Sequence, residues 1–143
     1  MNLELLLLVP IDHRLADKSE VNLSEVANDN FILYRPNSVL HDIILKFCND
    51  AGFHPNISFE AFNERTVAGL VGAKLGIALT PFIPGLDKRK IAMVKVCKPL
   101  CLIEIQMVWR TNGYSSPALS DFKSFLENNL DSLKKEPKMF PEW

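Results

Sequence analysis

The stretch from Thr66 to Pro81 constrains the fold more than any other part of the chain. Apolar residues recur there at the spacing of one helical face: Val67, Leu70, Val71 and Leu75. Small residues that would let this helix lie close against a sheet stand at Gly69, Gly72 and Ala73. Gly76 then frees the backbone for a turn, and the apolar run 77–80 is typical of a central strand covered on both faces. The stretch therefore predicts a helix that leads through a tight turn into a strand of a parallel sheet.

Further helices and strands are predicted on the N-terminal side of this stretch. They are a strand at 3–9 that is apolar except for Glu4, a short helix at 23–27, a strand at 31–34, a helix at 39–51 and a strand at 57–61. Asn22 and Glu25 have the spacing of a capping box, Asn37 or Ser38 caps the second helix, and Asn63 caps the helix that follows. Alternating strands and helices with right-handed crossovers place 31–34, 57–61 and 77–80 in one parallel sheet with helices on its faces.

The C-terminal part is predicted to add two strands and a helix. One strand is expected at 91–96 and another, with one solvent-exposed face, at 102–109. Ser116 as N-cap and Pro117 as first helical residue begin a final helix. Its apolar stripe consists of Leu119, Phe122, Phe125, Leu126, Leu130 and Leu133. Residues 134–143 are interpreted as a polar tail.

Composition excludes several classes of function. The chain of 143 residues has 16 basic and 17 acidic residues and no basic run, so we expect no binding to duplex DNA and no membrane contact by this chain itself. The longest apolar run, 5–9, is too short to cross a bilayer and lacks a positive n-region, which favours a cytoplasmic protein. Length and apolar content allow one domain or two small lobes.

Neither a metal site nor a catalytic centre is predicted, and no cofactor is expected. Cys48 is interpreted as a buried reduced thiol, while the spacing of Cys97 and Cys101 leaves half of a metal site or a strained disulfide as minor alternatives. Ser38, His41 and Asp42 have the composition of a triad. Adjacent helical residues diverge by about 100°, so we expect no relay between His41 and Asp42, and His41 is predicted to be a surface residue.

A ligand site is predicted at the carboxyl ends of the parallel strands, where two helices begin. Unpaired N–H groups and the positive helix ends would attract a carboxylate or phosphate. The candidate polar contacts are Arg35, Asn37, Ser38, Asn63, Arg65 and Thr66. The alternative is that Asn37, Ser38, Asn63 and Thr66 only cap their own helices.

Three segments together resemble the effector-binding domain of LysR-type transcriptional regulators. They are Leu8-Val9-Pro10-Ile11-Asp12-His13-Arg14-Leu15-Ala16, Phe31-Ile32-Leu33-Tyr34 and Leu70-Val71-Gly72-Ala73-Lys74-Leu75-Gly76-Ile77-Ala78-Leu79-Thr80-Pro81. Residues 107–110 with Ser116-Pro117-Ala118 and Phe122 resemble the end of that domain. The family usually has proline at the position of Arg14 and glycine at that of Lys74, so Lys74 has to adopt a left-handed conformation.

The resemblance implies an α/β, periplasmic-binding-protein-like (type II) regulatory fold. Residues 11–100 would form the second lobe, 1–10 and 101–133 the crossing strands and last helix of the first lobe, and 134–143 a tail. The effector contacts of the family map onto two loops of this sequence, which adds Pro36, Val39 and Glu64 to the candidates. The candidates in the first loop are Arg35, Pro36, Asn37, Ser38 and Val39, and those in the second are Asn63, Glu64, Arg65 and Thr66. DNA would be read by a separate winged helix-turn-helix, and most of the first lobe is absent from this sequence.

These observations together predict a small-molecule sensing regulatory fragment and not an enzyme. The effector is expected to be an anionic, carboxylate-like metabolite. The alternatives are a stand-alone solute-binding module of the same fold and a small α/β enzyme. Because 3–9, 102–109 and the stripe of the last helix would pack on elements that this sequence lacks, we also expect homo-oligomers.

Overall fold

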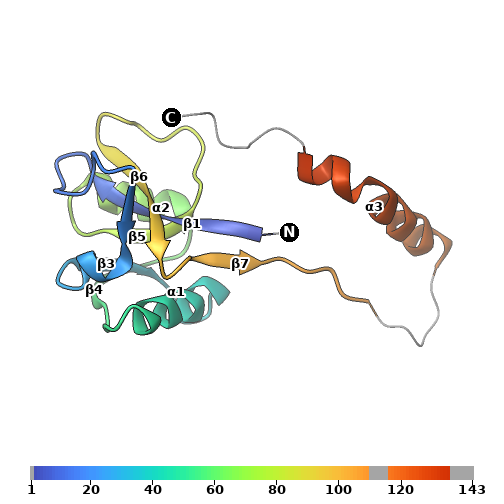
Figure 1. Cartoon of the computed structure of the whole chain (residues 1–143), viewed down its shortest axis with the longest axis horizontal. Coiled ribbons are helices and arrows are strands. Elements are labelled where there is room, and N and C mark those ends of the chain that lie inside the picture. The colour runs from blue at the N-terminus through green and yellow to red at the C-terminus, as the bar shows by residue number, and fades with distance from the viewer. Residues whose placement is uncertain (1, 110–115, 136–143) are drawn as a thin grey trace. The chain divides into compact units, whose positions relative to one another are not determined.

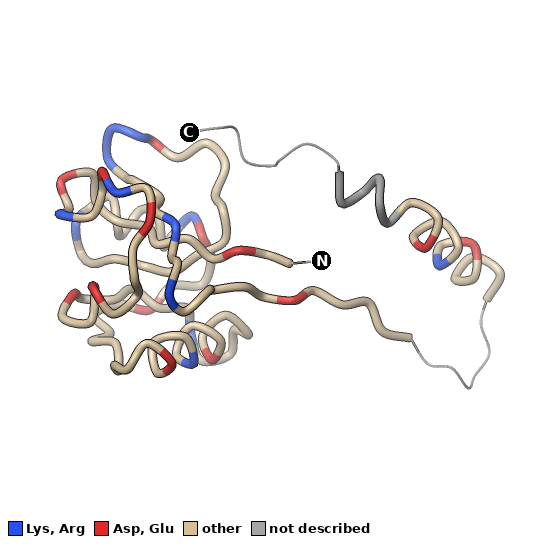
Figure 2. Tube along the Cα trace, viewed as in Figure 1, with Lys and Arg blue, Asp and Glu red and all other residues tan. Residues whose placement is uncertain are grey.

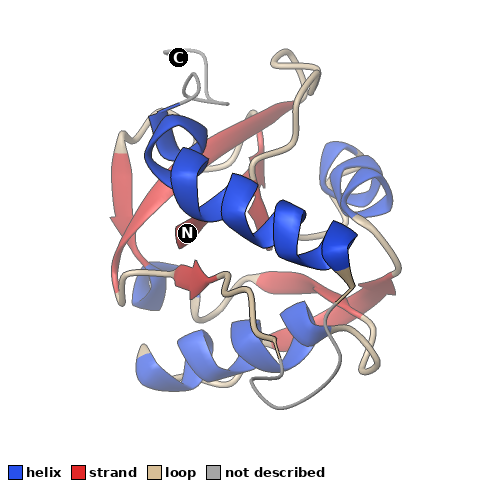
Figure 3. Cartoon of the chain, turned by 90° about the vertical axis from the view of Figure 1, so that its right-hand side faces the viewer, coloured by secondary structure: helices blue, strands red, loops and turns tan. Residues whose placement is uncertain are grey.

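The computed structural model describes residues 2–109 and 116–135, with side chains up to residue 129. The chain divides into two compact units, Asn2–Ile103 and the part from Glu104 onward, which are described separately. In the first unit the helices flank the strands (Figures 1 and 3). The second unit contains the last helix.

The main sheet of the first unit is built around its first strand. Strand β1 (Asn2–Pro10) lies between β5 (Ala78–Pro81) and β6 (Ile91–Lys98) and runs antiparallel to both. Strand β2 (Glu20–Asn22) adds in parallel to the outer side of β6, and β7 (Leu102–Glu104) also pairs with β1. The central position explains why β1 is apolar and buried from Leu5 to Pro10, since a strand with two neighbours and two covered faces has no contact with water.

The second sheet is a parallel pair that carries the helices. Strand β3 (Asn30–Tyr34) pairs in parallel with β4 (Asn56–Ala61), and α1 (Val39–Asp50) connects them. Helix α2 (Glu64–Gly72) follows β4 and packs on β1, β3 and β5, so that it joins the two sheets (Figure 1).

The predicted parallel sheet of three strands is only partly correct. Strand β3 pairs with β4 in parallel, as expected. The third predicted strand, 77–80, makes only a single parallel bridge to β3, between Ile77 and Phe31. The bridge consists of the Ile32 N–H to Ile77 carbonyl bond and the Ile77 N–H to Asn30 carbonyl bond, both 2.8 Å long. Beyond it, β5 runs antiparallel to β1. An apolar β1 needs hydrogen-bonded neighbours on both edges, and β5 supplies one of them.

The turn between α2 and β5 uses a different glycine property from the one predicted. Lys74 takes the left-handed conformation, with φ of 63°, as the family resemblance implied. At Gly76 an added Cβ would lie 2.7 Å from the Asn30 carbonyl oxygen, so the glycine permits the close approach of β3. Because α2 ends at Gly72, Leu75 does not belong to its apolar face and is 39% exposed.

Polar contacts hold the loop after β1 against the segment before β3. Arg14 Nη2 lies 2.6 Å from Asp29 Oδ2 and donates to the Glu25 carbonyl at 2.8 Å. Lys18 Nζ lies 2.7 Å from Glu25 Oε2, which lowers the pKa of that carboxyl group. The Glu25 side chain also accepts from Asn22 N–H at 2.9 Å. The predicted capping interaction is therefore present, but it begins a 3-10 helix, η1 (Leu23–Val26), and not an α-helix.

The C-terminal unit differs most from the sequence prediction. The strand expected at 102–109 ends at Glu104, and residues 105–109 have no regular pairing. Helix α3 (Pro117–Lys135) begins as predicted, with Ser116 Oγ accepting from Leu119 N–H at 3.2 Å. The Leu130 and Leu133 side chains lie outside the described residues. The assignment of 11–100 to one lobe, 1–10 and 101–133 to another and 134–143 to a tail stays a prediction.

Candidate functional site

Two helix N-termini open at one edge of the parallel pair. Strand β3 ends at Tyr34 and α1 starts after Ser38, while β4 ends at Ala61 and α2 starts after Asn63. Because the strands are parallel, the two connecting loops lie at the same edge. The Arg35 N–H to Ala61 carbonyl bond of 3.1 Å links the loops directly. The structure thus brings the two predicted clusters together. Residues 35–39 and 63–66 are called the binding edge.

The capping interactions expected at this edge are formed. Ser38 Oγ accepts from Leu40 N–H at 3.3 Å. Asn63 Oδ1 accepts from Thr66 N–H at 2.9 Å and lies 3.1 Å from Thr66 Oγ1. Ser38, Asn63 and Thr66 therefore have a structural role, and a ligand at the edge would rely on the remaining backbone N–H groups and on the cations.

Arg35 is the cation best placed for an anion at the edge. Its guanidinium carbon lies 3.5 Å from the centroid of the Phe62 ring, although the Phe62 side chain is 67% exposed. Among the residues described, no carboxylate lies within 4 Å of Arg35 or Arg65. The ring occupies one face of the Arg35 guanidinium and leaves its N–H edge for a planar oxyanion.

A buried hydrogen bond lies directly beneath the edge. Tyr34 and Thr80, the last buried residues of β3 and β5, are joined by their hydroxyl groups at 2.9 Å. Burial raises the pKa of Tyr34 to about 12, so the phenol stays protonated under all ordinary conditions. This bond fixes the strand ends from which Arg35 and Pro81 project.

The interpretation of His41 as a surface residue is wrong. Its side chain is 14% exposed, and Nδ1 lies 2.8 Å from Asp42 Oδ1. The expected absence of contact between His41 and Asp42 is therefore also wrong, although the two residues are adjacent in the first turn of α1. A triad is nevertheless not assembled: Ser38 Oγ is bonded to Leu40 N–H, and Ser38 contacts His41 through the backbone, from His41 N–H to the Ser38 carbonyl at 3.1 Å.

The three cysteines are free thiols. Burial raises the pKa of Cys48 and of Cys101 to about 12 in each case, which is typical of unreactive core thiols. Cys97 donates to the Val21 carbonyl at 3.2 Å and Cys101 to the Pro99 carbonyl at 3.4 Å. Within residues 2–109 and 116–129, no group of three or more possible ligands is placed to hold a metal ion.

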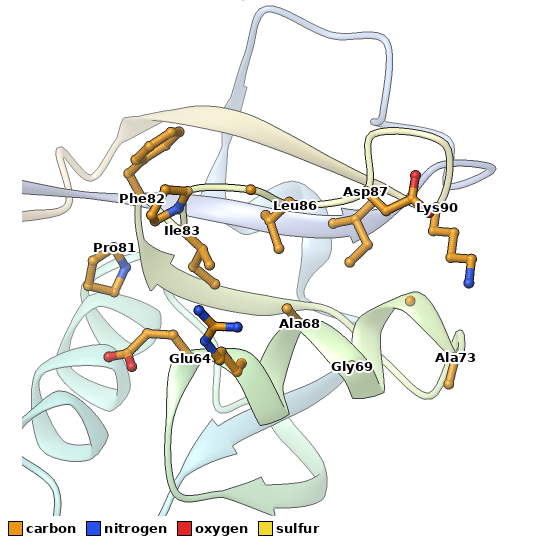
Figure 4. Close-up of a pocket in the computed structure, with 15 residues that line it drawn as sticks. Glu64, Ala68, Gly69, Ala73, Pro81, Phe82, Ile83, Leu86, Asp87 and Lys90 are labelled. Atoms are coloured by element: carbon orange, nitrogen blue, oxygen red, sulfur yellow. The ribbon is translucent and has the colours of Figure 1, made fainter. Parts of the chain in front are cut away.

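A groove that the sequence did not predict runs along α2. It has a volume of about 760 Å³ and lies between α2 and the segment Pro81–Ile91 (Figure 4). Glu64 and Arg65 of the binding edge line it as well. The remaining lining residues are Ala68, Gly69, Gly72, Ala73, Pro81, Phe82, Ile83, Pro84, Gly85, Leu86, Asp87, Lys90 and Ile91. Residues 82–90 show no periodic pattern, so only the exposed glycine of α2 could have indicated the groove.

Charges of both signs are interspersed along Asn2–Ile103 (Figure 2). The loop Lys88-Arg89-Lys90 brings three cations together, so the expectation of no basic run is wrong for this short segment. Arg89 is held by Asp87, with Nε to Oδ1 at 2.9 Å and Nη2 to Oδ2 at 3.0 Å. In the described ranges, no helix combines the length and apolar character needed to cross a bilayer.

Comparison with known proteins decides the family. The model of the LysR substrate binding domain matches residues 1–131. The chain belongs to this family. Its relatives include the HTH-type transcriptional regulator YybE of Bacillus subtilis, which is 36% identical over 86% of this chain and 42% of its own length. The transcriptional dual regulator GltC of the same organism is 31% identical over 90% of this chain and 43% of its own. This LysR-type chain therefore spans less than half the length of these relatives.

Solved structures confirm the predicted fold class. The effector-binding domain of QuiR in complex with shikimate has a TM-score of 0.74 and 24% identity, covering 94% of this chain and 63% of that one. The BenM effector-binding domain with benzoate has a TM-score of 0.65 and 19% identity, covering 100% of this chain and 67% of that one. The α/β fold is thus the periplasmic-binding-protein-like type II fold of LysR effector-binding domains.

Proposed function

We propose that this LysR-family domain senses a small anionic metabolite and binds its carboxylate at the edge formed by residues 35–39 and 63–66. The observation that carries the proposal is Arg35: its guanidinium rests on Phe62, and no described carboxylate neutralises it. An Arg with one face packed and its N–H edge free is arranged for a bidentate carboxylate. The two helix N-termini add positive potential at the same place.

The ligands of two structural neighbours support the carboxylate class. QuiR is described with shikimate and BenM with benzoate, and both compounds are carboxylates. The contacts expected for this chain are the Arg35 guanidinium, the first N–H groups of α1 after Ser38 and of α2 after Asn63, and the side chains of Asn37 and Arg65. Pro36, Val39, Glu64 and Thr66 would shape the surface around the carboxylate.

An amide NMR titration with benzoate and shikimate tests the proposal. We expect shifts concentrated at Arg35–Val39 and Asn63–Val67, and their loss in Arg35→Gln, since a charge-assisted hydrogen-bond pair contributes about 2–3 kcal/mol. Lys46→Gln is the matched control, because it removes a cation from the exposed part of the same helix α1. Shifts that persist unchanged in Arg35→Gln, or that lie elsewhere, would contradict the site assignment.

We further propose that the domain does no chemistry of its own and does not bind duplex DNA by itself. The relatives are transcriptional regulators, several of them with names that denote helix-turn-helix proteins, and only part of their length matches this chain. Net charge of −1 leaves little to neutralise phosphates. DNA contact is accordingly assigned to a separate domain of the regulator. A salt-sensitive gel shift by this chain at micromolar concentration would overturn that part of the proposal.

A further inference from the structure

The apolar residues most exposed to solvent in Asn2–Ile103 lie at the proposed anion site. Val39 and Phe62 are 77% and 67% exposed, and the next in order, Leu100, is 58% exposed. Val39 is the first residue of α1, and Phe62 stands between the end of β4 and the Asn63 cap of α2. Single exposed apolar residues are common on protein surfaces, but here the two highest exposed fractions fall on the two loops of one site. Each loop therefore presents an apolar side chain where a ligand is expected.

The turn chemistry of the two loops does not explain these exposures. Turns and first helical turns usually carry polar or small residues, because such side chains bond to backbone N–H groups. An apolar residue before an N-cap can pack against the fourth helical residue as a hydrophobic staple, and the pair here would be Phe62 and Val67. Val67 is fully buried, whereas Phe62 is 67% exposed, so most of the Phe62 ring does not pack in this way. Both Val39 and Phe62 remain largely uncovered by the residues described.

The Phe62 ring has one face occupied and the other open. Arg35 Cζ lies 3.5 Å from the ring centroid, which is the thickness of stacked planar groups, so the guanidinium covers one face. The exposed 67% of the side chain thus belongs mainly to the opposite face and the rim. The Arg35 N–H to Ala61 carbonyl bond of 3.1 Å fixes the two loops to each other. A carboxylate on the N–H edge of Arg35 would therefore lie at the rim of an uncovered apolar ring.

Side-chain oxygens of the binding edge are already engaged in helix caps. Ser38 Oγ accepts from Leu40 N–H at 3.3 Å, and Asn63 Oδ1 accepts from Thr66 N–H at 2.9 Å. Thr66 Oγ1 lies 3.1 Å from the same Asn63 oxygen. A ligand hydroxyl group at this place would have to compete with these caps or lie against the two exposed apolar side chains, where it has no partner. The edge therefore favours an acid whose remaining atoms are apolar.

We propose that Val39 and Phe62 determine specificity at the binding edge, and that the effector is a carboxylate on an apolar ring and not a polyhydroxylated acid. The inference rests on the proposed function and adds the chemical class of the part of the ligand that Arg35 does not hold. The ligand ring covers the open part of Phe62 and the side chain of Val39, which removes apolar area from water on both molecules. Hydroxyl groups on that ring would lose their water contacts without replacement, so the polyhydroxylated acid is rejected.

Three ring acids of equal charge provide the first test. They are benzoate, cyclohexenecarboxylate and shikimate, which is cyclohexenecarboxylate with three ring hydroxyl groups. Amide NMR titrations of the 143-residue chain give the dissociation constants. We expect the two apolar acids to bind at least about tenfold more tightly than shikimate, with shifts at Val39 and Phe62. Equal affinities for cyclohexenecarboxylate and shikimate would overturn the proposal and would indicate that another part of the regulator covers Val39 and Phe62.

Variants separate the contribution of the carboxylate from that of the ring. Val39→Thr introduces a hydroxyl group at nearly constant volume, and Phe62→Ala removes the aromatic ring. Because both side chains are exposed, we expect these variants to fold, and each should lower the ratio of the cyclohexenecarboxylate and shikimate affinities by at least about threefold. Arg35→Gln should weaken both acids and leave this ratio within about twofold. A ratio that is unchanged in Val39→Thr or in Phe62→Ala would overturn the assignment of that residue.

Leu75→Ala is the matched control for the loss of an exposed apolar side chain. Leu75 is 39% exposed and follows the C-terminal end of α2, whereas the binding edge is at the N-terminal end of this helix. We expect the affinities of all three acids to be unchanged in Leu75→Ala. A fall in the ratio as large as in Phe62→Ala would show that the preference for apolar acids does not arise at the edge.

The inference and the proposed function can fail separately. If all three acids bind equally and Arg35→Gln weakens them, the carboxylate site stands and the ring specificity is refuted. If the apolar acids are preferred and Phe62→Ala removes the preference, but Arg35→Gln changes nothing, the apolar contact stands and the Arg35 site falls. Absence of shifts at residues 35–39 and 62–67 with every acid refutes both.

Discussion

The two units of the chain have similar apolar patterns, but the apolar side chains are largely buried in β1 of the first unit and largely exposed in α3 of the second. In Asn2–Ile103, the side chains of Leu5, Leu7 and Leu8 are fully buried in β1, between β5 and β6. In the unit from Glu104 onward, Phe122 and Phe125 are 54% and 55% exposed although they follow the spacing of one helical face. An apolar stripe thus predicts which face of an element is to be covered, but not whether the same unit covers it.

The buried position of β1 contradicts one of the grounds on which self-association is expected. The strand 3–9 was expected to be uncovered, but β1 is the centre of the main sheet and offers no free edge. Of the three segments behind this expectation, those with exposed apolar residues lie mainly in the C-terminal unit: Ile105, Met107, Val108, Trp109, Leu119, Phe122 and Phe125. Homo-oligomer formation stays a prediction, and β1 no longer supports it.

The largest expected effect contrasts one leucine from each unit. Leu7→Ala removes a fully buried side chain opposite Leu79 and Val94, and should lower the free energy of unfolding by about 2–5 kcal/mol. Leu119→Ala, at a side chain 47% exposed, should change it by less than about 0.5 kcal/mol. Urea unfolding followed by circular dichroism measures both. Similar losses in the two variants would break the comparison.

Alkaline pH should destabilise the first unit through its buried acids. Burial raises the pKa of Tyr34 from 10.0 to about 12, so the folded state keeps a proton that the unfolded state loses between these values. Stability is full below pH 10 and declines by about 1.4 kcal/mol per pH unit above it for this residue. Cys48 and Cys101, shifted from 9.0 to about 12, add to the loss from pH 9 upward.

The control for this effect is Tyr34→Phe, which removes one of the titrating groups. We expect a shallower decline between pH 10 and 12, and at neutral pH a loss of about 1–2 kcal/mol because the Thr80 hydroxyl loses its partner. Thr80→Val in the same background should recover part of that loss. A pH dependence identical to that of the unmutated chain would mean that Tyr34 is not the titrating group.

Helix capping gives a smaller contrast between the units. Asn63→Ala removes the side chain that accepts from Thr66 N–H, and should cost about 1 kcal/mol. Asn128→Ala, in the exposed interior of α3, should be neutral or slightly stabilising because alanine has the higher helix propensity. Thermal unfolding distinguishes the two variants, and a cost at Asn128 as large as at Asn63 would contradict the assignment of the cap.

The smallest effect on unfolding is expected from the exposed stripe, although its effect on association should be clear. Phe122→Asp with Phe125→Asp should leave the urea midpoint of Asn2–Ile103 unchanged. If the stripe mediates association, light scattering at micromolar concentration should show a smaller species than for the unmutated chain. A monomer before the substitution, with α3 well protected from hydrogen exchange, would show that this helix is covered within one chain.

What could be predicted from the sequence was mostly local. Both helix caps and, to within one residue, the bounds of β3 and α1 depend on residues a few positions apart, and they are confirmed. The left-handed conformation of Lys74, which the family resemblance implied, is confirmed as well. The partner of β5 depends on a strand some seventy positions earlier, so the three-stranded parallel sheet was only partly right. Residue spacing along a helix does not determine side-chain rotation, so the contact between His41 and Asp42 could not be predicted from it.

The binding edge could be predicted from local sequence features, whereas the groove could not. Parallel pairing and two caps were enough to bring residues 35–39 and 63–66 to one edge, since each crossover is a local unit. The contact of Arg35 with Phe62 was not foreseen, because the loops meet only in three dimensions. The wall formed by residues 82–90 has no periodicity, so its position opposite α2 could not be derived from spacing.

The central place of β1 has a consequence for biosynthesis. Leu7 finds its strand neighbours only at Leu79 and Val94, so β1 is synthesised some seventy residues before the strands that complete it. Pairings so distant in sequence slow folding, and until they form an apolar strand with two open edges faces the solvent. The nascent chain is therefore expected to depend on chaperones during synthesis to a degree that the finished, well-buried strand does not reveal.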